Sequence, residues 1–243
     1  MKVILFCLYH TRRTAMIHRA TAIPITIVDD FLESPQVLLD IAQETSFVED
    51  TTYPGARSDC LSNIDYYLYD QIVSGILRLY TSAPVLDYRA TATLQKVSSK
   101  YGGGWVHRDP GLFTAITYLN RTDSPDGGTS LYKIKETLKG NEYHKKFAEM
   151  GVLKRGILAS KRRVDSGEYK KYGVLNNEMY DEVLKVPGAF NRLVCFDGHL
   201  LHAAGSYDRE GPEERLTLVI FFHAVVLEGG SLLPLDRLRR LSA

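Results

Sequence analysis

Beyond Ala83 the chain consists largely of short β-like runs that are separated by turn-forming residues. Runs of this length, rich in Val, Ile, Thr, Phe and Tyr, are typical of β-strands. Several of them in succession favour a β-sandwich or a barrel. The strands predicted in this way are residues 87–97, 112–119, 192–196 and 215–226.

The first 80 residues have a different character and predict helices. A strand is expected at 23–28, a helix at 34–44 and a second helix at 66–80. Ser34 suits the N-cap of the first helix and Pro35 suits its first turn. In both helices the apolar residues recur at helical spacing and so give one core-facing side. The predicted fold class is therefore α+β, mostly β with flanking helices.

Length and composition describe an ordinary globular chain. The 243 residues suit one domain with a long insertion, and the net charge of +1 gives no reason to expect a nucleic-acid partner. Three cysteines without a CxxC spacing, Cys7, Cys60 and Cys195, favour a reducing compartment, so we expect a cytoplasmic protein. No apolar run approaches the length of a membrane span. We interpret residues 1–15 as a tail outside the core.

Residues 133–186 form a polar, charged stretch that interrupts the strand pattern. Between 133 and 171 there are twelve Lys or Arg residues against five Asp or Glu. A helix is predicted at 136–150, and the glycine-containing remainder is interpreted as loops. A loop of this length inside a domain is uncommon unless it is functional or disordered. We interpret it as an insertion between two core strands.

A candidate metal-binding motif lies at His107-Arg108-Asp109. On an extended backbone, residues two apart point to the same face, so the imidazole and the carboxylate converge. With a second histidine they would form the facial triad that suits iron(II) and leaves coordination positions open. The motif by itself is weak, and a surface turn with a salt bridge from Arg108 is the alternative.

The second histidine of such a triad has two candidates, His199 and His202, which follow an apolar strand and a turn at Asp197-Gly198. His199 comes directly after the turn, where we expect it to face solvent. A returning strand would carry His202 inward, so we prefer His202.

Arg215 and Thr217 share one face of the last predicted strand, which is otherwise apolar. An arginine on such a strand is costly to bury unless it meets an anion. Its guanidinium matches a carboxylate, and a hydroxyl two residues further on can add a hydrogen bond. The alternative is an arginine at the strand end that pairs with Glu213 or Glu214.

The order of these three motifs resembles the 2-oxoglutarate/iron(II) oxygenase superfamily, in particular its prolyl-4-hydroxylase-like branch and some uncharacterised bacterial and viral members. The resemblance covers about residues 85–226 without the insertion. The residues that carry it are Leu94-Gln95, Tyr101-Gly102-Gly103, His107-Arg108-Asp109, Tyr118-Leu119-Asn120, Gly127-Gly128-Thr129, Phe190-Asn191-Arg192-Leu193, His202, Arg215 and Thr217.

The resemblance implies a double-stranded β-helix, or jelly-roll, core. It also implies iron(II), 2-oxoglutarate and dioxygen, with ascorbate as a supporting reductant. Iron would be bound by His107, Asp109 and His202. The roles implied for other residues are cosubstrate binding by Arg215, Thr217 and Tyr118, and substrate contacts by Trp105, Arg108 and Tyr101.

The expected activity is hydroxylation coupled to oxidative decarboxylation of 2-oxoglutarate to succinate. The substrate would be an amino-acid-derived metabolite, a carrier-bound intermediate or a peptide. Asp109 argues against the halogenating relatives, which lack that carboxylate. Two alternatives remain: a cupin-type metalloenzyme that does not use 2-oxoglutarate, and a jelly-roll binding protein without catalysis.

The charged insertion has two interpretations. As a lid over the site, its positive charge would favour an acidic partner, and its ordering would exclude water. Otherwise it is a solvated, partly disordered surface loop.

Overall fold

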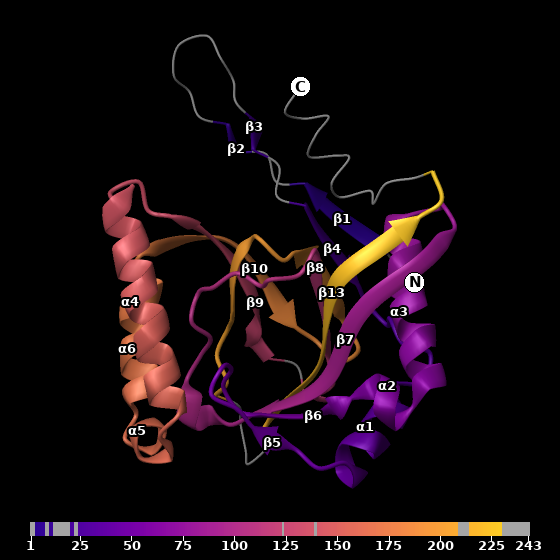
Figure 1. Cartoon of the computed structure of the whole chain (residues 1–243), viewed down its shortest axis with the longest axis horizontal. Helices are drawn as coiled ribbons and strands as arrows, with labels where there is room; N and C mark the ends of the chain where they lie inside the picture. Colours follow the sequence, from indigo (N-terminus) through magenta and orange to yellow (C-terminus); the bar gives the residue numbers. More distant parts are fainter. Residues whose placement is uncertain are drawn as a thin grey trace.

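The computed structural model describes residues 3–7, 10–11, 20–21, 24–122, 124–138, 140–208 and 214–229 (Figure 1). Its strands are β1 Val3–Cys7, β2 His10–Thr11, β3 Ala20–Thr21, β4 Pro24–Val28, β5 Val48–Glu49, β6 Ala56–Cys60, β7 Val85–Val97, β8 Phe113–Tyr118, β9 Ser124–Ile134, β10 Tyr180–Gly188, β11 Leu193–Asp197, β12 Leu201–Ala204 and β13 Arg215–Leu227. Its helices are α1 Pro35–Glu44, α2 Leu61–Ile64, α3 Tyr66–Tyr80, the 3₁₀ turn η1 Ser99–Tyr101, α4 Asn141–Leu158, α5 Lys161–Asp165 and α6 Glu168–Asn177.

Two antiparallel sheets form the centre of the molecule. The larger sheet has the order β1-β4-β11-β8-β13-β7-β6-β5, and the smaller has the order β10-β9-β12. Bridges from Gly103 to Ser206 and from His107 to His202 place residues 103–107 beside β12, as an irregular fourth strand of the smaller sheet. Between β7 and β13 the chain passes repeatedly from one sheet to the other. This is a double-stranded β-helix, which confirms the predicted jelly-roll core.

The strand pattern explains how one sheet has two apolar faces. In β11, Leu193 and Cys195 pack with the N-terminal helices, whereas Val194 and Phe196 pack between the two sheets. Successive side chains of a strand point to opposite faces, so a strand covered on both sides is apolar throughout. The central strand β8 accordingly has every residue buried.

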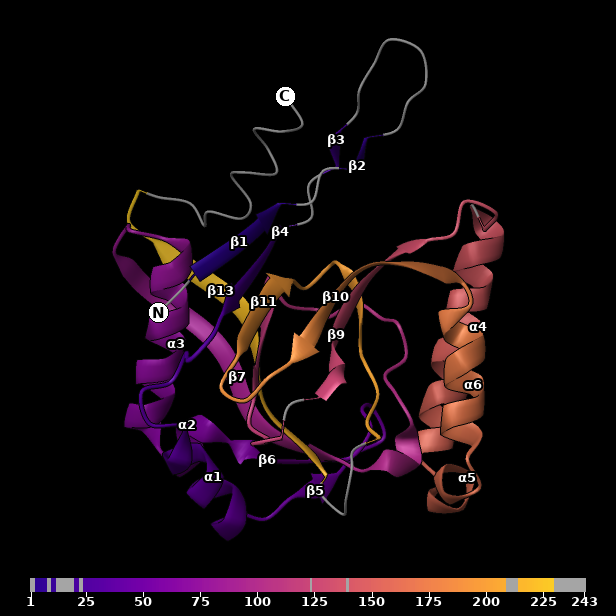
Figure 2. The same ribbon diagram turned by 180° about the vertical axis from the view of Figure 1, so that it is seen from behind.

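The N-terminal helices cover the outer face of the larger sheet (Figures 1 and 2). Both long helices lie where the sequence predicts them, with α3 matching residues 66–80 to the residue. The carboxylate of Asp65 caps α3 by accepting a hydrogen bond from the Leu68 amide, 2.9 Å away. Pro35 begins α1 as expected, but Ser34 makes no side-chain cap.

The prediction for the charged insertion was partly wrong. Its core is three helices, α4, α5 and α6, rather than one helix and loops, and they stand beside the barrel on the side away from α1–α3 (Figure 2). Glycine lowers helix propensity, but tertiary packing of buried side chains such as Ile157 and Tyr169 outweighs that cost. The insertion occupies 135–179, because β9 ends at Ile134 and β10 begins at Tyr180. The predicted limits of 133–186 therefore included part of both strands.

The four predicted core strands are confirmed, each with ends within two residues of those observed. The predicted strand at 23–28 is β4, which pairs with β1 at the edge of the larger sheet. Of the expected 1–15 tail the structure describes β1 and β2, and the other residues of that stretch lie outside the described part. Within the described residues, no helix has the length and apolar character needed to cross a membrane.

Candidate metal centre

The histidine and aspartate of the HxD motif lie on the irregular strand of the smaller sheet. The backbones of His107 and His202 exchange two hydrogen bonds, of 2.9 and 3.0 Å, and the Asp109 amide donates to Gly198 at 2.8 Å. The approach is close at Gly104, where a Cβ atom would lie 2.6 Å from the Ala204 amide nitrogen. Only glycine fits there. The pairing of these two segments brings His107 and His202, which are far apart in sequence, side by side.

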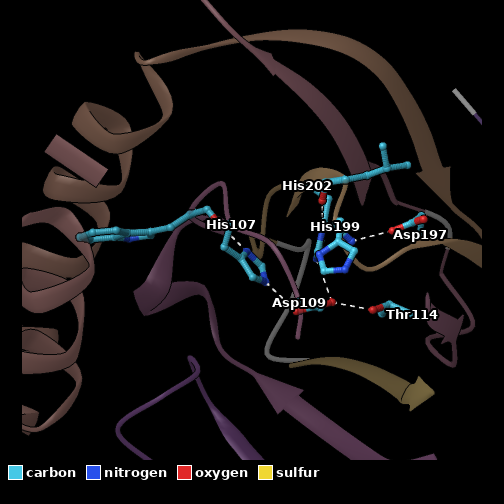
Figure 3. Close-up of polar contacts among 8 residues, drawn as sticks. His107, Asp109, Thr114, Asp197, His199 and His202 are labelled. Carbon is cyan, nitrogen blue, oxygen red and sulfur yellow. Dashed lines mark hydrogen bonds and ion pairs between the residues drawn. The ribbon is translucent and has the colours of Figure 1, made fainter. Parts of the chain in front are cut away.

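His107, Asp109 and His202 form a cluster whose ligand atoms all lie within 4.8 Å of one another (Figure 3). The Nε2 atom of His202 lies 3.1 Å from Asp109 Oδ2, and the Nε2 atom of His107 lies 3.4 Å from Asp109 Oδ1. His202 is only 4% exposed and Asp109 only 8%, whereas the His107 side chain is 40% exposed. One side of the cluster is thus closed by protein, and His107 lies at its accessible side.

Backbone carbonyls hold both imidazoles in one orientation. The Nδ1 atom of His107 lies 2.8 Å from the Trp105 carbonyl, and the Nδ1 atom of His202 lies 2.8 Å from the Leu200 carbonyl. A carbonyl can only accept, so each Nδ1 is the donor and carries the proton. In the neutral ring each Nε2 then keeps a free lone pair directed at the shared point, as in metal sites. The surrounding protein and the neighbouring His202 lower the pKa of His107, which favours that neutral form.

Asp109 is held as an ionised carboxylate. Burial opposes its ionisation, but the adjacent imidazoles of His107 and His202 outweigh that effect, so the pKa of Asp109 lies well below its usual range. Thr114 of β8 donates a further hydrogen bond to Oδ2 at 2.6 Å (Figure 3). The three side chains therefore provide one negative and two neutral donors.

His199 takes no part in the cluster. It is exposed, and its backbone amide donates to Asp197 Oδ1 at 2.8 Å, which closes the turn before β12. The expectation that His199 faces solvent while His202 points inward is confirmed by their burial.

Arg215 lies at the start of β13 and is 4% exposed. Its Nε donates to the Gly127 carbonyl at 3.1 Å, while its Nη2 is buried without a hydrogen-bond partner in the part of the chain that the structure describes. Thr217 is fully buried, and its hydroxyl likewise lacks a partner. The centroid of the Tyr118 ring lies 5.4 Å from the guanidinium carbon of Arg215. Within the described residues no carboxylate pairs with Arg215; Glu214 is exposed, and Glu213 lies outside the described part.

One cavity of about 400 Å³ connects the triad with Arg215. Trp105 and Arg108, two of the three predicted substrate contacts, line it as well. Tyr101 does not line it, and instead packs edge-on against Tyr169 of α6 with ring centroids 5.1 Å apart. The structure therefore places Tyr101 in the packing between insertion and barrel.

Several cavity residues were missed by sequence reasoning. Arg57 of β6 and Lys154 of α4 bring two further cations to the cavity, and Tyr207 and His223 also line it. Arg57 stands in a polar stretch before the second predicted helix, and Lys154 is one of many insertion cations. No local signal in the sequence singles out either of them.

The fold and the cluster together define the class: a jelly-roll protein with a three-residue candidate metal centre in a cavity of the barrel. Within that class, the chain belongs to a family of unknown function (DUF6445), whose model matches residues 10–222. No curated protein matches the sequence.

Solved structures with a similar fold share little sequence with this chain. HygX from Streptomyces hygroscopicus, solved with nickel, 2-oxoglutarate and hygromycin B bound, is 14% identical with a TM-score of 0.49, covering 82% of each chain. A prolyl-4-hydroxylase from Pseudomonas putida is 14% identical with a TM-score of 0.40, covering 82% of this chain and 91% of that one. The epimerase SnoN from nogalamycin biosynthesis is 11% identical with a TM-score of 0.43, covering 84% and 80%.

Proposed function

We propose that this protein is a non-haem iron(II) oxygenase that uses 2-oxoglutarate and dioxygen. Hydroxylation is the default outcome, and the substrate is a small metabolite, a peptide or a carrier-bound intermediate. One observation carries the proposal: a single cavity contains a His-Asp-His triad and a buried arginine whose Nη2 has no hydrogen-bond partner among the described residues.

The donor set fits iron(II). Two neutral imidazole nitrogens and one carboxylate form the facial triad of non-haem iron sites, which leaves positions open for other ligands. A structural zinc site would instead be closed by four protein ligands. Among the described residues, the cluster of His, Cys, Asp and Glu that could hold a metal has three members, His107, Asp109 and His202.

The polar atoms left without partners fit 2-oxoglutarate. A buried guanidinium nitrogen and a buried hydroxyl, Arg215 Nη2 and Thr217 Oγ1, are costly to leave unsatisfied. A carboxylate in the cavity would satisfy the guanidinium by a charge-assisted hydrogen bond, whereas Thr217 is not among the residues that line the cavity. The hydroxyl of Tyr118 is hydrogen-bonded to Thr129 at 2.7 Å, and its ring lies beside the guanidinium but is not among the groups that line the cavity.

The protein's own groups bind, orient and exclude water. When bound, iron(II) supplies the activation of dioxygen coupled to decarboxylation of 2-oxoglutarate to succinate. The Nδ1 hydrogen bonds of His107 and His202 keep each Nε2 free for the metal, and Thr114 fixes the Asp109 carboxylate. Trp105 lines the cavity beside the triad and contributes an apolar wall.

Anaerobic reconstitution with iron(II) and 2-oxoglutarate tests this function. We expect the weak visible charge-transfer band that arises when 2-oxoglutarate chelates the metal, and we expect it to be absent in His107→Ala. Iron binding without a band would favour a cupin-type metalloenzyme that does not use 2-oxoglutarate. Failure to bind iron would favour a jelly-roll binding protein without catalysis.

A further inference from the structure

We propose that the cavity binds a substrate that carries a carboxylate or phosphate group, held between Lys154 and Arg57. The inference rests on the proposed function, because it names the substrate class of the same cavity. It differs from that function in its residues, since neither cation belongs to the triad or to the cosubstrate pair.

The charges that line the cavity are unbalanced. Arg57, Arg108, Lys154 and Arg215 contribute four positive charges, whereas Asp109 is the one carboxylate among the lining residues. An iron(II) ion would add two more positive charges, and 2-oxoglutarate carries two negative ones. Arg108 is exposed at the rim, so the excess that remains inside the cavity resides on Lys154 and Arg57.

Two aromatic rings hold Arg57 in place, and among the described residues it forms no ion pair. Its guanidinium carbon lies 3.9 Å from the centroid of the Tyr53 ring and 5.3 Å from that of Phe221. These cation–π contacts fix the plane of the fork. Its Nε is buried and has no hydrogen-bond partner among the described residues. A guanidinium presented in this way matches an incoming oxyanion.

Lys154, which belongs to α4 of the insertion, lines the same cavity as Arg57. It is the one Lys or Arg of the described insertion residues that lines the cavity. Lys154 therefore shares one cavity with the candidate metal centre and with Arg57. No described carboxylate lies within ion-pair distance of Lys154.

The two cations are thus suited to share one anionic group. Both side chains are half-buried, so an unpaired charge there is destabilising, and burial lowers the pKa of Lys154 to about 8. An oxyanion that contacts both side chains removes that cost and orients the rest of the substrate toward the triad. Remote binding groups of this kind position the reacting carbon.

Calorimetric titration of the protein loaded with nickel(II) and 2-oxoglutarate tests the site. The probes are phenyl phosphate and phenylacetate, with benzyl alcohol as the neutral match. We expect at least one anion to bind, about 10-fold or more weakly in Lys154→Gln and in Arg57→Gln. Lys145→Gln removes the same charge from an exposed position of α4 and should bind like the wild type. Whichever anion binds more tightly identifies the group as phosphate or carboxylate.

Failure to bind either anion, or equal binding by all variants, overturns the inference. If Arg57→Gln does not fold, Arg57→Lys keeps the charge but removes the fork, and it should still weaken binding. The charge-transfer band measures 2-oxoglutarate separately, and its affinity should not change in Lys154→Gln or Arg57→Gln. If it falls in those variants, the two cations hold the cosubstrate and the inference fails while the proposed function stands. If no band forms but anion binding still depends on both cations, the proposed function fails and the anion site is supported.

Discussion

The cavity has two unlike walls. The wall formed by the jelly-roll strands presents His107, Asp109 and His202, whose side chains have hydrogen-bond partners that fix their orientation. The wall formed by α4 and β6 presents Lys154 and Arg57, which have no anionic partner among the described residues. The first wall is complete before anything binds, whereas the second has charges that a ligand must satisfy.

The first wall is suited to binding a metal, and the second is suited to recognising an anion. A metal centre needs ligands held to within fractions of an ångström, and supporting hydrogen bonds provide that. Recognition of an anion needs unsatisfied donors, which the protein leaves unpaired at some cost in stability. The proposed metal chemistry thus belongs to the strands that carry the triad, and the proposed anion recognition belongs to α4 and β6.

Removal of a metal ligand from the strand wall should have the largest effect. His202→Ala should abolish turnover, because loss of a supporting residue alone costs about 10–100-fold and a ligand contributes more. Succinate formation and iron binding measure the effect, and circular dichroism checks the fold. The matched control is His199→Ala, which changes an exposed histidine three residues away. Full activity in His202→Ala would transfer the ligand role to His199.

Arg215→Gln should separate the cosubstrate from the metal. Charge-assisted hydrogen bonds of a buried arginine contribute about 1.5–3 kcal/mol, so the 2-oxoglutarate requirement should rise roughly 10- to 100-fold. Iron affinity should remain unchanged, since Arg215 is no ligand. Titration of the charge-transfer band against 2-oxoglutarate measures the shift. An unchanged requirement would place the carboxylate contact elsewhere.

Lys154 should make the stability of the metal-free protein depend on pH. Burial lowers its pKa from 10.5 to about 8, with Arg57 opposing protonation and Asp109 favouring it. The charged amine thus destabilises the folded state below pH 8, and this cost disappears as the pH rises toward 10.5. Relative to Lys154→Gln, the unfolding free energy of the wild type should rise by roughly 1–3 kcal/mol across that interval. Urea denaturation at several pH values measures it, and a constant difference would contradict it.

Two glycine substitutions in the insertion should change the free energy of unfolding in opposite directions. A Cβ at Gly173 would lie 2.7 Å from Trp105 Nε1, an atom already bonded to the Tyr169 carbonyl, so Gly173→Ala should destabilise by about 1–3 kcal/mol. A Cβ at Gly151 meets nothing closer than 3.9 Å, so Gly151→Ala should stabilise by about 0.5–1 kcal/mol through helix propensity. Thermal unfolding distinguishes them. Equal effects would mean that the helices do not pack on the barrel as described.

The packing of the insertion also bears on its predicted role as a lid. Asn177 bridges the insertion to the strand that carries His107, accepting from the Val106 amide at 2.8 Å and donating to the Gly104 carbonyl at 2.9 Å. The helices thus support the strand that holds His107 and Asp109. Whether they also move over the substrate stays a prediction, and deletions within 140–175 would test it by comparing coupled with uncoupled turnover.

Much of the fold could be predicted from the sequence, because periodicity along the chain is a local property. The helix at 66–80 and the four core strands follow from apolar spacing, and β11 shows why an all-apolar run is a strand covered on both faces. Of the insertion helices, the predicted helix at 136–150 overlaps α4, whereas α5 and α6 could not be predicted, since their apolar spacing is weak. Their stability comes from packing of residues such as Tyr169 against Trp105.

Some residues of the candidate site could likewise be predicted from the sequence, and others could not. The sequence by itself predicted His107, Asp109, His202 and Arg215 as an ordered set, because motif spacing is a local property and the order of the motifs resembles an oxygenase superfamily. Only the tertiary structure decided that Arg57 and Lys154 meet at the same cavity. Their meeting depends on how β6 and α4 pack around the barrel, and no local pattern of charge or spacing encodes that arrangement.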